Sequence, residues 1–207
     1  SSDYQQGAYA AECGDAEGFY RNDADLVGIN FGASFSVGVW AKCTSDAQDG
    51  KLISKWNASA SQREFDLWRE STDTSINISI SESGTSGIVV TSEASNWPIN
   101  TWVHLCVTFD SSTYVFRLYK NGSEVVAGGF PYTWTTVPYN GSQRLEIGQT
   151  TDTSRDFLGL FDEVFFVSRK LTDAEVSDVY NFGFGVPPAT IDQRSFRFRN
   201  DDGSESA

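Results

Sequence analysis

Hydrophobic and polar residues alternate along most of the chain in short runs. The runs are rich in β-branched and aromatic residues, and clusters of Gly, Ser, Asp or Asn bound them. Such runs predict half-buried antiparallel strands. The predicted strands span residues 34–43, 51–56, 63–70, 76–81, 87–93, 102–110, 115–122, 144–149 and 162–169. Their regular spacing indicates an all-β sandwich or barrel rather than an α/β fold.

Two local motifs add a turn and a helix to these strands. Asn121-Gly122 follows a predicted strand and supplies the two residues with positive φ that a type I′ hairpin needs. Thr172 and Glu175 have the spacing of a capping box, so we predict one short helix that begins near Thr172. The apolar residues that follow share one helical face, which we expect to lie against the sandwich.

The chain of 207 residues has the length of a single all-β domain. We predict the sandwich over residues 1–186, because the prolines at 187 and 188 end regular pairing. Residues 187–207 then form a Pro-Pro linker and an extended tail, in which Phe196 and Phe198 alternate with arginines in a strand pattern. The chain contains no methionine, so we expect it to be processed or cut from a longer one.

The formal net charge of −13 excludes several classes of partner. A strongly acidic molecule repels phosphate backbones and anionic lipid headgroups, so nucleic acid is not an expected ligand. No apolar run approaches the roughly 18 to 20 residues of a membrane span, so we expect no membrane insertion. An acidic surface also suits hard cations such as calcium, although it more often serves solubility.

Several motifs occur in an order that resembles a known family. They are residues 35–42, 51–56, 102–110, 118–122, 159–164 and 171–176. Together they resemble the laminin-G-like, concanavalin A-like lectin/glucanase family over roughly residues 8–184. The resemblance implies a two-sheet antiparallel β-sandwich of the jelly-roll type. It also implies glycan binding, adhesion or protein contact, often with a structural calcium. The chain departs from the family at Cys13-Gly14, where relatives usually have an aromatic residue before the glycine.

The resemblance implies a calcium site between the last strand and the N-terminal edge. Carried over onto this chain, Asp162 supplies a carboxylate, and Gly14 and Asp15 supply backbone oxygens. Such a mixture of oxygens suits Ca²⁺. The alternative is that Asp162 caps a strand end or pairs with Arg155 or Arg169.

Acidic residues on one strand raise the question of catalysis. Some glycoside hydrolases of this fold carry closely spaced acids on a strand, and Glu64, Asp66 and Glu70 occupy such a strand here. The outer two would lie about 20 Å apart along an ideal strand, which is too far to flank one glycosidic bond. We therefore interpret these acids as solvated charges. We interpret His104 as a residue that packs within the fold. A Ser or Cys nucleophile would therefore have no obvious general base.

Aromatic residues in turn-rich segments are the candidates for ligand contact. Sugar rings stack on exposed aromatic faces, and polar neighbours fix their orientation. The candidates are Trp97, Tyr132, Trp134 and Tyr139, with Asn140 as the polar neighbour. The alternative is that these aromatic residues anchor loops or belong to the core.

Three cysteines and four sequons bear on whether the protein has disulfides and whether it is secreted. Cys43 and Cys106 fall in predicted strands, where they could be bridged or could be buried thiols, and we favour buried thiols. The N-x-S sequons are consistent with secretion and begin at Asn57, Asn77, Asn121 and Asn140.

The sequence thus predicts a non-catalytic extracellular binding or adhesion module whose partner is a glycan or an extracellular protein. The alternative is a structural subunit of a surface filament, virion or other assembly. In that case terminal segments would pair with a neighbour's sheet edge, with Phe196 and Phe198 as anchors. A glycoside hydrolase is the remaining catalytic alternative.

Overall fold

The computed structural model describes residues 10–14, 18–26, 28–92, 97–151, 155–182 and 199–200. Almost all of its regular structure is strand. The elements are β1 (Ala11–Cys13), β2 (Phe19–Arg21), the 3₁₀ helix η1 (Asp23–Asp25), β3 (Phe35–Cys43), β4 (Gly50–Asn57), β5 (Gln62–Arg69), β6 (Ile76–Ile80), β7 (Ile88–Thr91), β8 (Trp102–Asp110), β9 (Val115–Lys120), β10 (Ser123–Glu124), β11 (Tyr132–Thr133), β12 (Leu145–Ile147), β13 (Gly159–Val167), α1 (Asp173–Phe182) and β14 (Arg199–Asn200).

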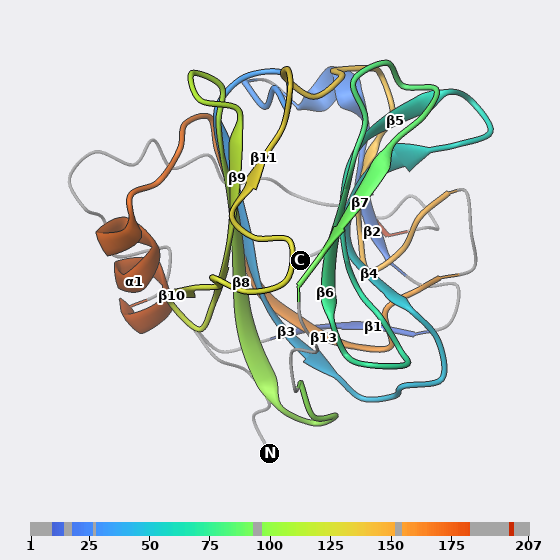
Figure 1. The fold of residues 1–207 in the computed structure, drawn as a ribbon. Coiled ribbons are helices and arrows are strands. Elements are labelled where there is room, and N and C mark those ends of the chain that lie inside the picture. Colours follow the sequence, from blue (N-terminus) through green and yellow to red (C-terminus); the bar gives the residue numbers. More distant parts are fainter. Residues whose placement is uncertain are drawn as a thin grey trace.

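The strands form two antiparallel sheets that face each other (Figure 1). Sheet A has the order β1-β13-β3-β8-β9-β10, with β11 also paired to β9. Sheet B has the order β14-β2-β12-β4-β5-β6-β7. Helix α1 lies on the outer side of sheet A (Figure 1). The predicted all-β sandwich with one short helix near the C-terminal end is therefore confirmed.

The main hydrophobic core lies between the two sheets. Alternate residues of β3, such as Val37 and Val39, are fully buried in it. A cluster of aromatic rings fills one part of the core: the ring centroid of Phe31 lies 4.8 Å from that of Phe35 and 5.4 Å from that of Phe65. Edge-to-face and stacked pairs of this kind add to the stabilisation that burial of the rings provides.

All nine predicted strands are present, with ends that differ from the prediction by three residues or fewer. The capping box is also confirmed. The Thr172 amide donates to the Glu175 carboxylate at 2.8 Å, and the Glu175 amide donates to the Thr172 hydroxyl at 3.3 Å. Pattern analysis missed β1, β2, β10 and β11, because strands of two or three residues are too short to show alternation.

The predicted linker and the anchors Phe196 and Phe198 lie outside the described residues. Of the tail, Arg199 and Asn200 are described, and their backbones pair with Tyr20 and Phe19 of β2 in the same chain. Pairing with a neighbouring chain stays a prediction. Within the described ranges, no helix is long and apolar enough to cross a membrane.

Helix α1 packs on a second apolar cluster on the outer face of sheet A, which includes Cys106. Tyr180 of α1 stacks on Trp40 of β3 with ring centroids 5.4 Å apart. Asn121 and Gly122 both have positive φ, as the predicted hairpin turn requires. A Cβ atom at Gly122 would lie 2.9 Å from the Tyr180 ring. Glycine is therefore needed there both for the turn and for the close approach of the helix.

The cysteines are free, buried thiols. Cys106 pairs in register with Gly38, five residues before Cys43 on β3. At about 3.3 Å per residue the two cysteines lie roughly 16 Å apart, far beyond the ~7 Å limit for a disulfide. They also belong to different apolar clusters, since Cys43 lies in the main core and Cys106 lies under α1. The expectation of buried thiols is confirmed.

His104 is buried beneath α1 in contact with the rings of Trp40 and Tyr180, and neither of its ring nitrogens has a hydrogen-bond partner among the described residues. Burial lowers the pKa of His104 to about 4, against about 6.5 for an exposed imidazole. Below about pH 6.5 the unfolded chain takes up a proton at His104, whereas the folded protein does so only near pH 4. The free energy of unfolding therefore decreases as the pH falls over this range. Over this range we expect the loss in unfolding free energy to be smaller in His104→Phe than in the wild type. The difference between the two losses is up to about 3 kcal/mol. Urea denaturation at pH 7.5 and pH 4.5 measures the difference, and equal losses in the two proteins would contradict it.

Candidate functional site

A row of polar side chains crosses the outer face of sheet B. Glu146, Ser54, Asp66 and Ser79 are neighbours in register on β12, β4, β5 and β6, and all four are buried. The interpretation of Glu64 and Asp66 as solvated charges is wrong, because their exposed fractions are 0% and 1%. Lysine side chains from β4 form ion pairs with both carboxylates.

A β-bulge in β4 determines which residues reach this face. Lys51 pairs with Trp68 and Ile53 pairs with Leu67, so Leu52 is an extra residue in β4. Both Leu52 and Ile53 are buried in the main core. The extra residue reverses the alternation, so that Lys51 and Ser54 can both lie on the outer face.

A groove with a volume of about 240 Å³ lies on this outer face. Polar, aromatic and aliphatic residues from β4 to β7 and from the segment before β13 line it. They are Lys51, Trp56, Ala58, Asp66, Trp68, Ser79, Val89, Thr150 and Arg155. Trp56 is half-buried, and Val89 is 55% exposed. The groove therefore offers apolar surface beside polar groups, as sites for small molecules commonly do.

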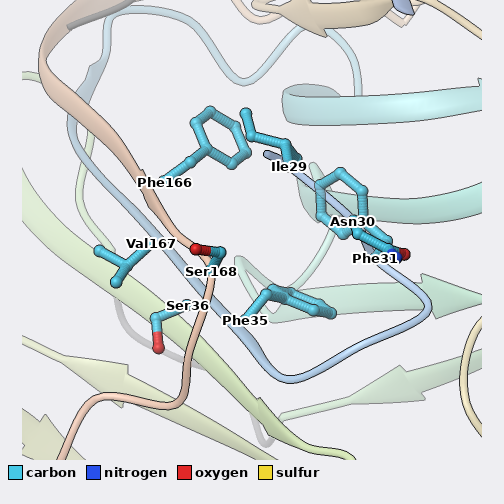
Figure 2. A pocket seen from close by; sticks show the side chains of 8 residues that line it. All are labelled: Ile29, Asn30, Phe31, Phe35, Ser36, Phe166, Val167 and Ser168. Atoms are coloured by element: carbon cyan, nitrogen blue, oxygen red, sulfur yellow. The ribbon is translucent and has the colours of Figure 1, made fainter. Parts of the chain in front are cut away.

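A second hollow lies where the loop before β3 meets the end of β13 (Figure 2). Its volume is about 10 Å³, and apolar rings that include Phe31, Phe35 and Phe166 line it. Such a volume holds one water molecule at most. It is a packing defect of the core rather than a ligand site.

Several contacts hold Trp68 in the lining of the groove. Its indole N–H donates to the Ser79 hydroxyl at 3.1 Å. The Lys51 ammonium lies 4.6 Å from the centroid of the Trp68 ring, and the Arg155 guanidinium carbon lies 5.8 Å from it. Cation–π contacts of this kind are strengthened when water is excluded. The two cations and the ring therefore fix one another's positions.

Lys51 also forms an ion pair with Asp66, and both side chains are buried. Burial raises the pKa of Asp66 above its ordinary value, although the Lys51 charge acts in the opposite direction. A buried pair of this kind contributes little net stability, but removal of one partner leaves an uncompensated charge. The pair thus holds the floor of the groove in one arrangement.

Arg155 is the exposed cation of the groove, with 47% of its side chain accessible. Its guanidinium contacts Asp49 at 3.1 Å. The other oxygen of Asp49 accepts hydrogen bonds from the amide and the hydroxyl of Ser71, at 3.0 and 2.9 Å. Asp49 is therefore fixed by the turn after β5, and in turn it positions Arg155 at the rim.

A separate ionic cluster surrounds Lys55. Its ammonium lies 2.6 Å from Glu64 and 2.8 Å from Asp23 of η1, and it donates to the Gly141 carbonyl at 3.0 Å. A second bulge in β5, opposite Lys55 and Trp56, places Glu64 beside the ammonium. Burial raises the pKa of Glu64 to about 7, and the Lys55 charge lowers it only in part. The cluster ties two loops to the end of the sheet.

The aromatic residues predicted from the sequence do not form one site. Trp97 is fully buried, donates its indole N–H to the Thr101 carbonyl at 2.9 Å and packs against Phe157. Its ring is thus unavailable for stacking on a sugar, and Trp97 anchors the loop before β8 as the alternative interpretation holds.

The other predicted ligand contacts fall in two places. The ring centroids of Tyr132 and Trp134 lie 5.9 Å apart. Both residues lie beside β9 and pack against the main core. Tyr139 donates its backbone amide to the Ser81 carbonyl at the end of β6, and the exposed Asn140 follows it. None of these residues lines the groove on sheet B. Their role in ligand binding stays a prediction.

The predicted calcium ligands are separated by the register of the strands. Cys13 pairs with Gly159, so Gly14 lies beyond that pair while Asp162 lies three residues away in the other direction. The Asp162 carboxylate accepts a hydrogen bond from the Glu163 amide at 2.8 Å. Asp15 lies outside the described residues. Among the described residues, no group of three or more His, Cys, Asp or Glu side chains could hold a metal ion. The calcium site stays a prediction.

Sequence analysis missed the residues that do line the groove, above all Trp56, Trp68 and Arg155. A signal was present on β5, where Trp68 shares the polar phase of the strand with Asp66 while Phe65 and Leu67 point into the core. An aromatic residue in the polar phase of an amphipathic strand lies on the outer face of the sheet, where it can line a groove, as the largely buried Trp68 does. Arg155 carries no comparable signal, because long-range pairing alone brings it to sheet B.

Comparison with known proteins gives one family and many similar folds. Residues 20–177 match the family model of the concanavalin A-like lectin/glucanases superfamily. No curated protein sequence matches the chain significantly.

Three solved structures illustrate the similar folds. A pentraxin from Limulus polyphemus has a TM-score of 0.63 and 16% identity, with 90% of this chain and 85% of that chain covered. The CBM40 domain of a Ruminococcus gnavus sialidase, bound to α2,3-sialyllactose, has a TM-score of 0.66 and 16% identity, with 83% and 96% covered. The binding domain of botulinum neurotoxin serotype G has a TM-score of 0.55 and 16% identity, with 73% and 36% covered.

Glu64 gives the structure a pH dependence opposite in sign to that of His104. Because the folded state holds the Glu64 proton more tightly than the unfolded chain, the contribution of Glu64 to stability falls as the pH rises from about 4.5 to about 7. We expect the decrease in unfolding free energy over this pH range to be roughly 1–3 kcal/mol smaller in Glu64→Gln than in the wild type. Chemical denaturation at pH 5 and pH 8 measures it, and Glu82→Gln at an exposed position is the matched control. The same pH slope in wild type and Glu64→Gln would refute the assignment.

The predicted calcium site has a test of its own. A ligand that binds the folded state alone stabilises it, by about 2.7 kcal/mol at a concentration one hundred times its Kd. If Asp162 ligates calcium, excess chelator lowers the Tm of the wild type and leaves that of Asp162→Asn unchanged. Identical melting curves of the wild type with calcium and with chelator would remove Asp162, Gly14 and Asp15 from the candidate residues.

Proposed function

Because the chain belongs to the concanavalin A-like lectin/glucanases superfamily, we propose that it is a non-catalytic extracellular module that binds a glycan in the groove on the outer face of sheet B. The observation that carries this proposal is a half-buried Trp56 beside a set of fixed polar groups in one groove. Sugar rings have apolar faces and polar edges, and this combination of groups complements both.

The orientation of Trp56 is set by the backbone around it. A Cβ atom at Gly87 would lie 2.4 Å from the Trp56 ring, so the indole packs directly against the chain at that glycine. The Trp56 carbonyl accepts a hydrogen bond from the Thr150 hydroxyl at 3.3 Å. A ring that is already immobilised loses little conformational entropy when a ligand stacks on it.

Similar structures support a glycan as the ligand. The Ruminococcus gnavus domain was solved with α2,3-sialyllactose and with α2,6-sialyllactose, and this chain covers 96% of it in both cases. The low identity shows a common fold and leaves the site to be argued from the residues of this chain. Those residues provide the aromatic and polar lining described above.

The carboxylates of sheet B support binding without hydrolysis. A glycosidase needs two carboxyl groups that flank the scissile bond, one of them free to donate a proton. Here Asp66 is paired with Lys51, and Glu146 accepts hydrogen bonds from the Thr151 amide and hydroxyl at 3.0 and 2.7 Å. Glu64 is occupied by Lys55. All three carboxylates are buried and serve to hold neighbouring side chains.

Substitution of Trp56 tests the proposed function. We expect a glycan array to identify a ligand of the wild-type chain, and Trp56→Ala to weaken that binding at least about tenfold, which equals ~1.4 kcal/mol of lost stacking. Tyr114→Ala is the control, because it removes an exposed aromatic ring outside the groove. Titration calorimetry of both variants, with melting curves to confirm folding, gives the comparison. Unchanged affinity in Trp56→Ala would refute the groove as the site.

A further inference from the structure

Building on the proposed function, we infer that the groove selects saccharides that carry an anionic group, a carboxylate or a sulfate, and that Arg155 at the rim recognises this group. Three features of the groove support the inference. They are the balance of its donors and acceptors, the way in which Arg155 is held, and the burial of its other charges.

The groove offers more hydrogen-bond donors than acceptors. The Ser79 hydroxyl accepts from Trp68 and keeps its own O–H as a donor, whereas the Thr150 hydroxyl donates to the Trp56 carbonyl and keeps acceptor capacity. One Asp66 oxygen is paired with Lys51, and the other is buried without accessible surface. The Arg155 guanidinium therefore supplies most of the donor capacity that a ligand can reach, because Lys51 is buried in its pair with Asp66. A ligand that fits such a lining has to bring acceptor oxygens.

Arg155 keeps most of its donors for a ligand. A guanidinium has five N–H donors in a planar fork. Among the described residues, the contact with Asp49 is the one ion pair of Arg155, and it involves a single amino group. An ion pair at this degree of exposure is weak in water, so Asp49 positions the fork without cancelling its attraction for a second anion. Two oxygens of a carboxylate or sulfate match the fork in a bidentate manner.

The other charges of the groove do not compete for an anion. Lys51 and Asp66 neutralise each other within a buried pair, and their combined charge is zero. The whole chain has a net charge of −13, which opposes an anion at long range. At physiological salt, however, charges are screened over about 8 Å. Recognition consequently depends on the short-range geometry of Arg155 beside Trp68.

Binding of one saccharide series by the purified chain tests this inference. The series consists of lactose, 3′-sialyllactose, 3′-sialyllactose with its carboxylate converted to an amide, and 3′-sulfolactose. We expect at least one of the two anionic forms to bind at least fivefold more tightly than lactose. If the carboxylate is recognised, the amide should lose this gain. Comparison of sialyllactose with sulfolactose shows which anion fits better.

Variants then assign the preference to Arg155. Arg155→Gln should abolish the preference for the anionic saccharide over lactose, whereas Arg155→Lys should restore part of the preference. Arg117→Gln is the matched control, because Arg117 is a partly exposed arginine that pairs with one carboxylate, Glu124, on the other sheet. Its affinities should equal those of the wild type.

Two results would overturn the inference and leave the proposed function intact. One is equal affinity for lactose and for both anionic saccharides, with binding still dependent on Trp56. The other is an anionic preference that persists in Arg155→Gln. If neither this series nor a glycan array gives any binding, the proposed function fails and the inference fails with it.

Discussion

The arrangement of the outer face of sheet B depends on one extra residue in β4, Leu52, which forms a β-bulge. A strand of strict alternation would send either Leu52 or Ile53 to the outer face, or would turn Lys51 towards the core. Each alternative exposes a large aliphatic side chain or buries a charge without its partner. The bulge at Leu52 avoids both and sets Lys51 beside Trp68 and Asp66. The groove therefore exists because the core-facing alternation of β4 shifts by one residue at this point.

The buried polar groups of this face determine shape more than stability. Desolvation of Lys51 and Asp66 offsets most of what their attraction provides, and the raised pKa of Asp66 reflects that cost. What the pair secures is a single arrangement, because each group would be left unpaired if the other moved. Trp68 is fixed in the same way by its hydrogen bond to Ser79 and by the two cations near its ring. A lining ordered before the ligand arrives adds little entropic cost to binding.

Local patterns in the sequence predicted most of the fold. Alternation identified the long strands, and the spacing of Thr172 and Glu175 identified the helix, because both signals arise between residues close in the chain. The site was harder to predict. Arg155 reaches Trp68 through the pairing of distant segments, and the burial of Asp66 depends on a lysine from the neighbouring strand. Trp97 shows the converse error, since an aromatic residue in a turn-rich segment proved to be a buried anchor.

The contact between Gly122 and Tyr180 has a consequence for the order of folding. The surface on which α1 rests is assembled mainly from β8, β9 and β13, with Trp40 of β3 and the hairpin turn, and most of these parts lie far from the helix in the chain. A ten-residue helix is marginal in isolation, so α1 gains its stability from that surface. The sheet and its turn must consequently form before the helix can dock. We expect α1 to be among the last elements to form when the chain folds and among the first to be released when it unfolds.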